Sequence, residues 1–144
     1  MSRDCTFCRI VAGSLAARIL HQGDRVVVFL DRNQAALGHL LVVPREHVEQ
    51  WHQLDEPTVF EMGAVAHRWA GVLVQTIAPE GYNLLMNNGR AAGQDVFHAH
   101  LHITPRSSGD GYYAFGGHQR LLTAQEADEL AAKLMAGAST ELDA

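Results

Sequence analysis

Three histidines occur at two-residue spacing in residues 96–104, which read VFHAHLHIT. In an extended strand, alternate side chains point to the same face, so His98, His100 and His102 would share one face at separations of roughly 6–7 Å. Imidazoles in such a row can serve as nucleophiles, as acids and bases, or as metal ligands. A solvated face of an edge strand is the plain alternative, but three histidines in strict alternation favour a chemical site.

The segment directly before these histidines is small and flexible, with Gly89 and Gly93 inside residues 87–95. Backbone N–H groups in such a loop can turn toward a phosphate. The segment lacks the Gly-Lys-Ser/Thr ending of a P-loop, and taken alone it is most simply a turn. Because it leads into the histidine strand, it predicts an anion-binding rim beside a row of nucleophiles.

Two thiols near the amino terminus are a second candidate for chemistry. Cys5 and Cys8 are the two cysteines of the chain, and Cys-x-x-Cys spacing can give two thiolates to one metal ion or form a redox pair. Two ligands do not complete a tetrahedral site, so any further ligands must come from distant segments. The residues before Cys5 cannot form the strand that a thioredoxin-like redox motif needs. Two reduced, unliganded thiols are the third possibility.

The elements that must position these residues follow from apolar periodicity and turn residues. The pattern predicts an α+β fold with an antiparallel sheet of about five strands and helices on one face. A long helix begins at Asp55, and a short one follows Thr123, which forms a capping box with Glu126. The predicted strands are 19–21, 26–30, 39–43, 82–86 and 97–104, with Pro105 ending the last, and the predicted helices are 5–12, 55–78 and 124–135.

A single domain accounts for all 144 residues, with a core over about 5–110 and a frayed tail at 137–144. Apolar residues make up 47% of the chain and charged residues 19%, which argues against disorder. The net charge of −5 argues against binding a nucleic-acid polymer, although a few local donors can hold a small anion. Neither a signal peptide nor a membrane-spanning run is present, so the sequence predicts a cytoplasmic protein without a membrane partner.

The long predicted helix carries more apolar surface than one core stripe requires. Its minimal stripe is widened by four further apolar residues, Val65, Trp69, Val72 and Val74. A stripe of that width generally needs a second surface to cover it. The pattern therefore predicts a homodimer, and a helix buried wholly within one subunit is the alternative.

Three blocks of the sequence, taken in order, match the pattern of one known family. Residues 5–13 read CTFCRIVAG, residues 38–47 read GHLLVVPREH, and residues 93–106 read GQDVFHAHLHITPR. In this order they resemble the histidine-triad, or HIT, family of nucleotide-binding proteins, and the resemblance covers roughly residues 5–110. It implies a HIT-like α+β fold, a homodimer, and an enzyme that acts on a purine nucleotide substrate.

The resemblance also implies roles for single residues. His100 matches the family's nucleophile, which attacks the α-phosphate of a nucleoside 5′-phosphoramidate or a related conjugate and forms a nucleotidyl-histidine intermediate. His102 would contact the phosphoryl oxygens or the leaving group, with His98 and His39 as orienting partners. The other implied contacts are to the phosphate or leaving group from Gln94 and Asn87, to the ribose from Asp31, and to the base from Phe29, Phe7 and Ile10.

Structural zinc is implied at the two thiols. Similar microbial members bind zinc through such cysteines together with residues that match His47 and His98, so the expected ligands are Cys5, Cys8, His47 and His98. This zinc would tie the amino terminus to the sheet near the active site. Asp95 departs from the family pattern, because some phosphoramidase-type members carry a hydroxyl there and an acid is less helpful beside a phosphate.

Three other functions remain open for the same residues. A dinucleoside polyphosphate hydrolase would use the same site and the same nucleophile. A metal-dependent hydrolase would bind one ion through His98, His100 and His102, although metal triads usually draw a ligand from elsewhere in the chain. A nucleotide-binding protein without turnover is the third. A serine hydrolase with a Gly-x-Ser-x-Gly elbow is excluded, because that motif is absent.

Overall fold

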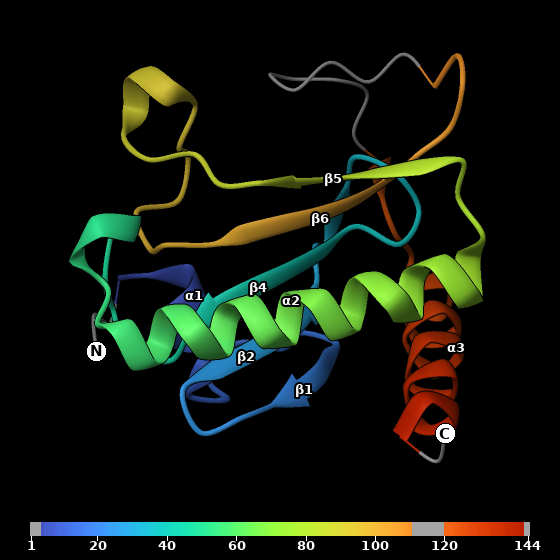
Figure 1. The fold of residues 1–144 in the computed structure, drawn as a ribbon, viewed down its shortest axis with the longest axis horizontal. Coiled ribbons are helices and arrows are strands. Elements are labelled where there is room, and N and C mark those ends of the chain that lie inside the picture. Colours follow the sequence, from blue (N-terminus) through green and yellow to red (C-terminus); the bar gives the residue numbers. More distant parts are fainter. Residues whose placement is uncertain (1–3, 111–119, 143–144) are drawn as a thin grey trace.

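The computed structural model describes residues 4–110 and 120–142. Its centre is a five-stranded antiparallel sheet in the order β1-β2-β4-β6-β5 (Figure 1). This confirms the predicted α+β class and the five-stranded sheet. The strands are β1 (Ile19–Gln22), β2 (Val26–Leu30), β4 (Leu40–Pro44), β5 (Gly81–Leu85) and β6 (Leu101–Arg106).

The α-helices of the described chain pack on both faces of this sheet. The long helix α2 (Glu56–Ile77) crosses one face of the sheet, and α3 (Ala124–Leu142) packs against α2. The short helix α1 (Thr6–Val11) packs on the other face. The prediction of helices on one face was therefore wrong for α1. The physical reason lies in β2, where every residue is buried, so Val28 needs cover from α2 and Phe29 needs cover from α1.

The histidine strand begins later than predicted. β6 starts at Leu101 rather than at residue 97, so His98 and His100 lie in the irregular segment before the strand and only His102 lies within it. β6 also continues past Pro105. β4 begins at Leu40, opposite Ile103, so among the described residues Pro105 pairs only with Tyr82 of β5. The missing N–H of Pro105 is tolerated because β4 does not reach it.

Two short strands were not predicted. β3 (Asn33–Gln34) pairs with β7 (Arg120–Leu121) in a separate two-stranded sheet. This pairing joins the connection between β2 and β4 to the segment that leads into α3. Strands of two residues carry no usable periodicity, which is why the sequence does not indicate them.

The predicted start of the long helix α2 is confirmed, with Asp55 as its N-cap. The Asp55 side chain accepts a hydrogen bond from the Thr58 N–H at 3.0 Å, and the helix ends at Ala78, which adopts a left-handed conformation with φ of 51°. Val65, Trp69 and Val72 are buried within the same chain, and only Val74 of the widening residues is exposed. The width of the apolar stripe is thus used inside one subunit, and it gives no reason to expect a dimer.

The last helix is longer than predicted. The capping box is confirmed, since Glu126 N–H donates to the Thr123 hydroxyl and Thr123 N–H donates to the Glu126 carboxylate. The helix does not end at residue 135 but runs to Leu142, and residues 143–144 of the predicted frayed tail lie outside the described residues. Gly137 lies within this helix, directly against Thr76 of α2, where a Cβ would collide with the threonine hydroxyl.

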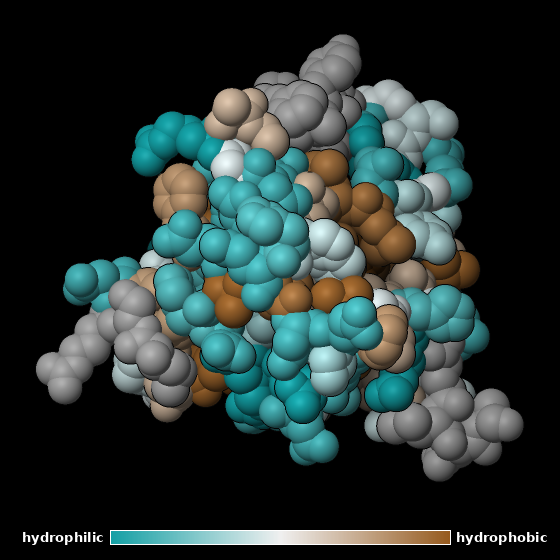
Figure 2. All heavy atoms as spheres, turned by 60° about the vertical axis from the view of Figure 1, so that its left-hand side comes forward, coloured by the Kyte–Doolittle hydropathy of each residue, from teal (hydrophilic) through white to brown (hydrophobic). Residues whose placement is uncertain are grey.

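The surface seen in Figure 2 is largely hydrophilic, with apolar groups set between polar ones. No helix in the described part of the chain combines the length and apolar character that crossing a membrane requires.

Candidate functional site

The structure brings the four residues of the predicted metal site together. Cys5 caps α1, Cys8 lies in α1, His47 follows β4, and His98 precedes β6. The Cys8 Sγ atom lies 3.3 Å from His47 Nδ1 and 3.5 Å from His98 Nδ1. The Cys5 Sγ atom lies 3.5 Å from the same His98 nitrogen, and all four ligand atoms lie within 4.8 Å of one another.

These distances fit a tetrahedral zinc ion. Zinc binds thiolate sulfur at about 2.3 Å and imidazole nitrogen at about 2.0–2.1 Å, which sets a sulfur–nitrogen edge of about 3.5 Å in a tetrahedron. Two sulfurs and two nitrogens are also the donor set of a closed structural site. Burial raises the pKa of the Cys5 thiol, so the thiolate form needs a nearby cation to stabilise it.

Backbone carbonyls determine which nitrogen carries the proton in two of the triad histidines. Pro44 O lies 2.8 Å from His98 Nε2, and His98 O lies 2.7 Å from His100 Nδ1. A carbonyl oxygen can only accept, so each of these nitrogens donates. Neutral His98 therefore turns the lone pair of Nδ1 toward the thiols. Neutral His100 keeps the lone pair of Nε2 free, as a nucleophile requires.

His102, the third histidine of the triad, carries its proton on the other ring nitrogen, and its contact with His39 determines this. The Ala35 N–H donates to His39 Nδ1 at 3.3 Å, and His39 Nε2 lies 2.8 Å from His102 Nδ1. Because a backbone N–H can only donate, neutral His39 carries its proton on Nε2 and donates it to His102. Neutral His102 then carries its own proton on Nε2. The His102 ring lies next to the His100 ring, with 4.8 Å between centroids. The ring with a lone pair on Nε2, His100, therefore neighbours the ring with a proton on Nε2, His102.

Burial keeps these imidazoles neutral. Desolvation lowers the pKa of His39 to about 3 and the pKa of His102 to about 4, and it also lowers the pKa of His100. The neighbouring carboxyl of Asp31 lies 3.6 Å from His39 Nδ1, and burial raises its pKa to about 6. At neutral pH the site therefore contains neutral histidines beside an ionised aspartate.

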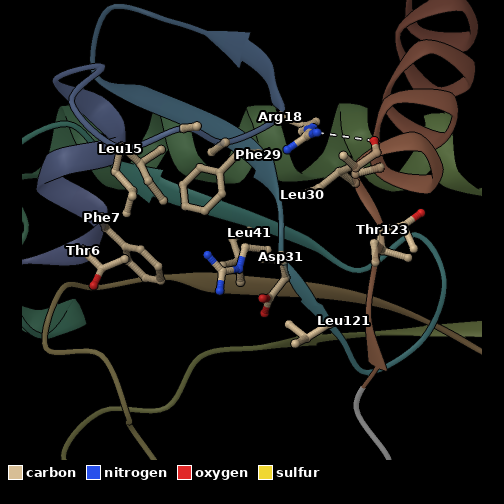
Figure 3. A pocket seen from close by; sticks show the side chains of 17 residues that line it. Thr6, Phe7, Leu15, Arg18, Phe29, Leu30, Asp31, Leu41, Leu121 and Thr123 are labelled. Carbon is tan, nitrogen blue, oxygen red and sulfur yellow. Dashed lines mark hydrogen bonds between the residues drawn. The ribbon is translucent and has the colours of Figure 1, made fainter.

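A cavity of about 650 Å³, a volume in the range of small-molecule sites, is lined by Phe7 and Asp31, which contact His100 and His39 respectively. The four residues predicted to contact base and ribose, Phe7, Ile10, Phe29 and Asp31, all line this cavity. Figure 3 shows Phe7 and Phe29 along its wall, and their ring centroids are 5.5 Å apart, edge to face. Phe7 also packs edge-on against His100 at 5.0 Å, so one ring links the cavity to the histidines.

The side chains of Gln94 and Asn87, in the loop before the histidines, make hydrogen bonds within the protein. Gln94 is buried, its Nε2 donates to Glu49 O and Val96 O, and its Oε1 accepts from the Gly89 N–H. Both N–H donors of this amide are thus used by the protein, and Gln94 braces the loop. Asn87 is half-buried and donates to Gly93 O at 3.4 Å.

Asp95 lies beside His100. Its Oδ1 is 3.7 Å from His100 Nε2, and its side chain is 81% exposed. A carboxylate at this position places a negative charge beside the nitrogen that would approach a phosphate.

The three triad histidines do not converge on one point. Within the described residues, the side chains that could share a metal ion form two groups: His98 belongs to the thiol group, and His102 belongs to a group with Asp31 and His39. His100 belongs to neither. The alternative of one catalytic ion held by all three triad histidines is therefore wrong, and the reason is that the chain bends before β6 instead of continuing as a strand.

Two of the atoms that orient the histidines were not predicted, because they belong to the backbone. Pro44 O and the Ala35 N–H carry no side-chain signal. The buried side chain of Gln34, next to Ala35, was also not predicted, and its only signal is an amide residue five positions before His39.

Comparison with known proteins places this small α+β domain, with its row of oriented histidines, in a defined class. Residues 13–109 match the family model described as the HIT domain, so the chain belongs to the HIT family. An uncharacterized HIT-like protein of Methanocaldococcus jannaschii is 38% identical over 107 residues, which cover 74% of this chain and 82% of that protein. The adenosine 5′-monophosphoramidase of Schizosaccharomyces pombe is 36% identical over 102 residues, which cover 71% and 74%.

Structural comparison agrees. The crystal structure of a zinc-bound histidine triad family protein from Mycobacterium smegmatis matches with a TM-score of 0.82 and 33% identity, covering 97% of this chain and 96% of that one. This confirms the predicted HIT fold.

Proposed function

We propose that this protein is a nucleotidyl hydrolase that cleaves nucleoside 5′-phosphoramidates or related purine nucleotide conjugates at the α-phosphate. The observation that carries the proposal is the pair of adjacent imidazoles with opposite proton placement: His100 with a free Nε2 lone pair and His102 with an Nε2 proton. The phosphoramidase of Schizosaccharomyces pombe in the same family supports this class of reaction.

The reaction proceeds in two displacements. His100 Nε2 attacks the α-phosphorus, the bond from phosphorus to the leaving nitrogen breaks, and the amine leaves with the proton offered at His102 Nε2. Water then attacks the phosphorus of the nucleotidyl-histidine, and the bond from phosphorus to His100 Nε2 breaks, which restores the neutral imidazole. The hydroxyl of the water stays on the phosphate and its proton replaces the one that the amine carried away. The products are an amine and a nucleoside monophosphate.

The nucleotide occupies the cavity beside the histidines. The base lies against the rings of Phe7 and Phe29 and the side chain of Ile10, and the ribose hydroxyls donate to the Asp31 carboxylate. The support is that these residues line one cavity and that Phe7 also touches His100. Gly89 and Gly93, with φ of 88° and 94°, give the neighbouring loop the backbone freedom to present N–H groups to the phosphate.

Structural zinc completes the proposal. Cys5, Cys8, His47 and His98 would hold it, and when bound it supplies a cross-link between the amino terminus and the sheet. The ligand distances and the zinc-bound relative from Mycobacterium smegmatis support this assignment. Holding the His98 ring also holds the His98 carbonyl, which accepts from the nucleophile.

We also propose a homodimer, and the support for it is the exposed apolar surface of β5 rather than the apolar stripe of α2. Within residues 4–110 and 120–142, β5 lies at the edge of the sheet and pairs with β6 alone. Its outer residues Tyr82 and Leu84 are 44% and 51% exposed, an unusual amount of apolar surface for an open edge strand.

A parallel assay tests the proposed reaction. Adenosine 5′-phosphoramidate, a dinucleoside polyphosphate and a nucleotidyl sugar are incubated with the wild-type protein, with His100→Ala and with His67→Ala, which removes an exposed histidine of α2. We expect phosphoramidate turnover that falls by roughly three orders of magnitude or more in His100→Ala, equivalent to about 4 kcal/mol, and is unchanged in His67→Ala. A His100→Ala variant that keeps more than a few per cent of the rate contradicts the proposal. Faster cleavage of the polyphosphate, lost in the same variant, favours the alternative substrate class.

A further inference from the structure

The side chain of Gln34 is buried between two residues of the proposed site. Gln34 lies in β3, three positions after Asp31 and five before His39, and only 3% of its surface is exposed. The proposed reaction assigns it no role. A buried amide is stable only when its donors and acceptors are satisfied, so its partners show what it holds in place.

The amide of Gln34 binds the backbone at both ends of the loop formed by residues 31–39. Its Nε2 donates to Asp31 O and, at 2.8 Å, to His39 O. Its Oε1 accepts from the N–H of Gly38 at 2.8 Å and from the N–H of His39 at 3.0 Å. All donors and acceptors of the amide are used, and both backbone polar groups of His39 are bound by this one side chain.

This loop contains the N–H donor that decides which ring nitrogens of His39 and His102 carry the protons. Ala35 follows Gln34 directly, and its N–H donates to His39 Nδ1. Two backbone hydrogen bonds, from the Asp31 N–H to His39 O and from the His39 N–H to Ala36 O, also hold this loop. Together with them, the Gln34 amide fixes the backbone of His39 relative to its own and so the distance from the Ala35 N–H to the His39 ring.

A second arrangement of the same protons is available. His39 Nδ1 lies 3.6 Å from the Asp31 carboxylate. If the Ala35 contact opened, His39 could carry its proton on Nδ1, facing that carboxylate, and its Nε2 would become an acceptor. His102 would then have to donate from Nδ1, and His102 Nε2 would lose the proton that the leaving group needs.

We infer that Gln34 is a positioning residue, which holds residues 31–39 in the shape that keeps the protons of His39 and His102 on their Nε2 atoms. The assignment of these protons rests on the contacts of His39 with the Ala35 N–H and with His102, and not on the proposed function. Their importance for turnover rests on the proposed function.

Two variants separate this role from general stability. Gln34→Met keeps the length of the side chain and removes all four hydrogen bonds, whereas Gln34→Glu keeps the acceptor and loses the two donors. Gly137→Ala, in which the new methyl group meets Thr76 between α2 and α3, is the control for destabilisation outside the site. Thermal unfolding first establishes that each variant folds.

The readout is nitrogen-15 NMR of the histidine rings, which distinguishes a protonated from an unprotonated ring nitrogen without substrate. In the wild-type protein and in Gly137→Ala we expect His102 with its proton on Nε2. In Gln34→Met, or in Gln34→Glu if the methionine variant does not fold, we expect the Nδ1-protonated form to appear. The value of kcat should fall roughly tenfold to a hundredfold, the size of a lost general-acid contribution, with a smaller change in nucleoside monophosphate affinity.

The outcomes are distinct. Retention of the wild-type proton positions in both Gln34 variants overturns the inference, whatever the activity. A kcat loss in Gly137→Ala equal to that in the Gln34 variants also overturns it. If the proton positions shift as expected but the wild-type protein cleaves no nucleotide conjugate, the inference on Gln34 stands and the proposed function fails.

Discussion

Asp31 illustrates how a residue can serve binding at a cost in stability. Its carboxyl is largely buried beside His39, and burial raises its pKa from 3.8 to about 6. A folded state that binds the proton more tightly than the unfolded state gains stability as the pH falls. At neutral pH the ionised carboxylate is therefore destabilising, which is tolerated if the nucleotide ribose needs an acceptor.

We predict that Asp31→Asn stabilises the protein at pH 7 and weakens nucleotide binding. Asparagine keeps the acceptor for the Asn33 N–H and has no charge to bury. A shift of about two pKa units corresponds to about 3 kcal/mol as an upper value, and the difference should shrink as the pH falls through 6 and vanish near 4. Urea unfolding at pH 7 and pH 4 measures it. A variant less stable than wild type at pH 7, or one with the same advantage at pH 4, contradicts the assignment.

The charge of Asp95 should act on the substrate rather than on the fold. Its exposed carboxylate lies 3.7 Å from Nε2 of His100, the proposed attacking nitrogen, so it would repel an incoming phosphate. We expect Asp95→Asn to lower KM for an anionic substrate several-fold at low ionic strength, with a smaller difference at high salt because exposed charges are screened. Steady-state kinetics at two salt concentrations test this, with Glu56→Gln on α2 as a control of equal charge. An unchanged KM, or a change independent of salt, would show that Asp95 does not face the substrate.

At the scale of elements, local patterns were predictable and long-range contacts were not. β2 and α2 match their predicted bounds closely, because a continuous apolar run and a helical stripe are recorded in adjacent residues. The start of β6 was missed because distant contacts set it. His98 is held by Pro44 O and by the thiols, and the Ala99 N–H donates to Val48 O. These bonds take the place of backbone pairing with β4 in the residues before Leu101.

For the site, the sequence likewise predicted part of the arrangement and missed the part that depends on the fold. The sequence, through its family resemblance, identified the side chains that meet in space: the four zinc candidates, the neighbouring His100 and His102, and the cavity residues. It did not show that Gln94 is occupied by the loop, or that Pro44 and Ala35 orient the imidazoles through backbone atoms. Backbone donors and acceptors are common to every residue, so only the fold reveals which ones are used.

Zinc should be required to keep α1 in place. A six-residue helix is not stable by itself in water, and the thiols connect α1 to His47 and His98. We predict about one zinc per chain in protein purified without a His-tag and chelators, loss of that zinc in Cys5→Ser/Cys8→Ser, and a lower Tm of the double variant. Elemental analysis and thermal unfolding measure both, with His67→Ala as a control that keeps zinc. Absence of zinc from the wild-type preparation would reject the site.

The crossing of α2 and α3 depends on Gly137. Alanine normally favours a helix over glycine, but here a methyl group would collide with the Thr76 hydroxyl. We therefore expect Gly137→Ala to destabilise the protein by about 1–3 kcal/mol, and Thr76→Ala in the same chain to recover part of the loss. Urea unfolding of the two single variants and the double variant gives the coupling. A stabilising Gly137→Ala variant would mean that the helices do not cross this closely.

For the whole molecule, the edge strand β5, and not the helix α2, gives the reason to expect a dimer. The apolar stripe of α2 is consumed by the core of its own chain, while Tyr82 and Leu84 remain exposed on β5. Edge strands with apolar surface are usually covered.

We predict a particle of about 32 kDa in light scattering, twice the 15.8 kDa of the chain, and a shift toward monomer in Leu84→Glu. Val74→Glu, on the exposed side of α2, is the matched control and should remain dimeric. A wild-type mass of about 16 kDa at micromolar concentration would show that β5 stays open, and dissociation by Val74→Glu alone would place the interface on α2.

The central claim is that His100 forms a covalent bond to the nucleotide, and direct detection of that bond is its most stringent test. Protein in excess over adenosine 5′-phosphoramidate is quenched in base at short times within a single turnover, digested and examined by mass spectrometry. We predict an adenylyl group on the peptide that contains His100, located on that residue, which appears and decays as adenosine monophosphate is released. Turnover without any adduct at these times, or an adduct on another residue, would contradict the account.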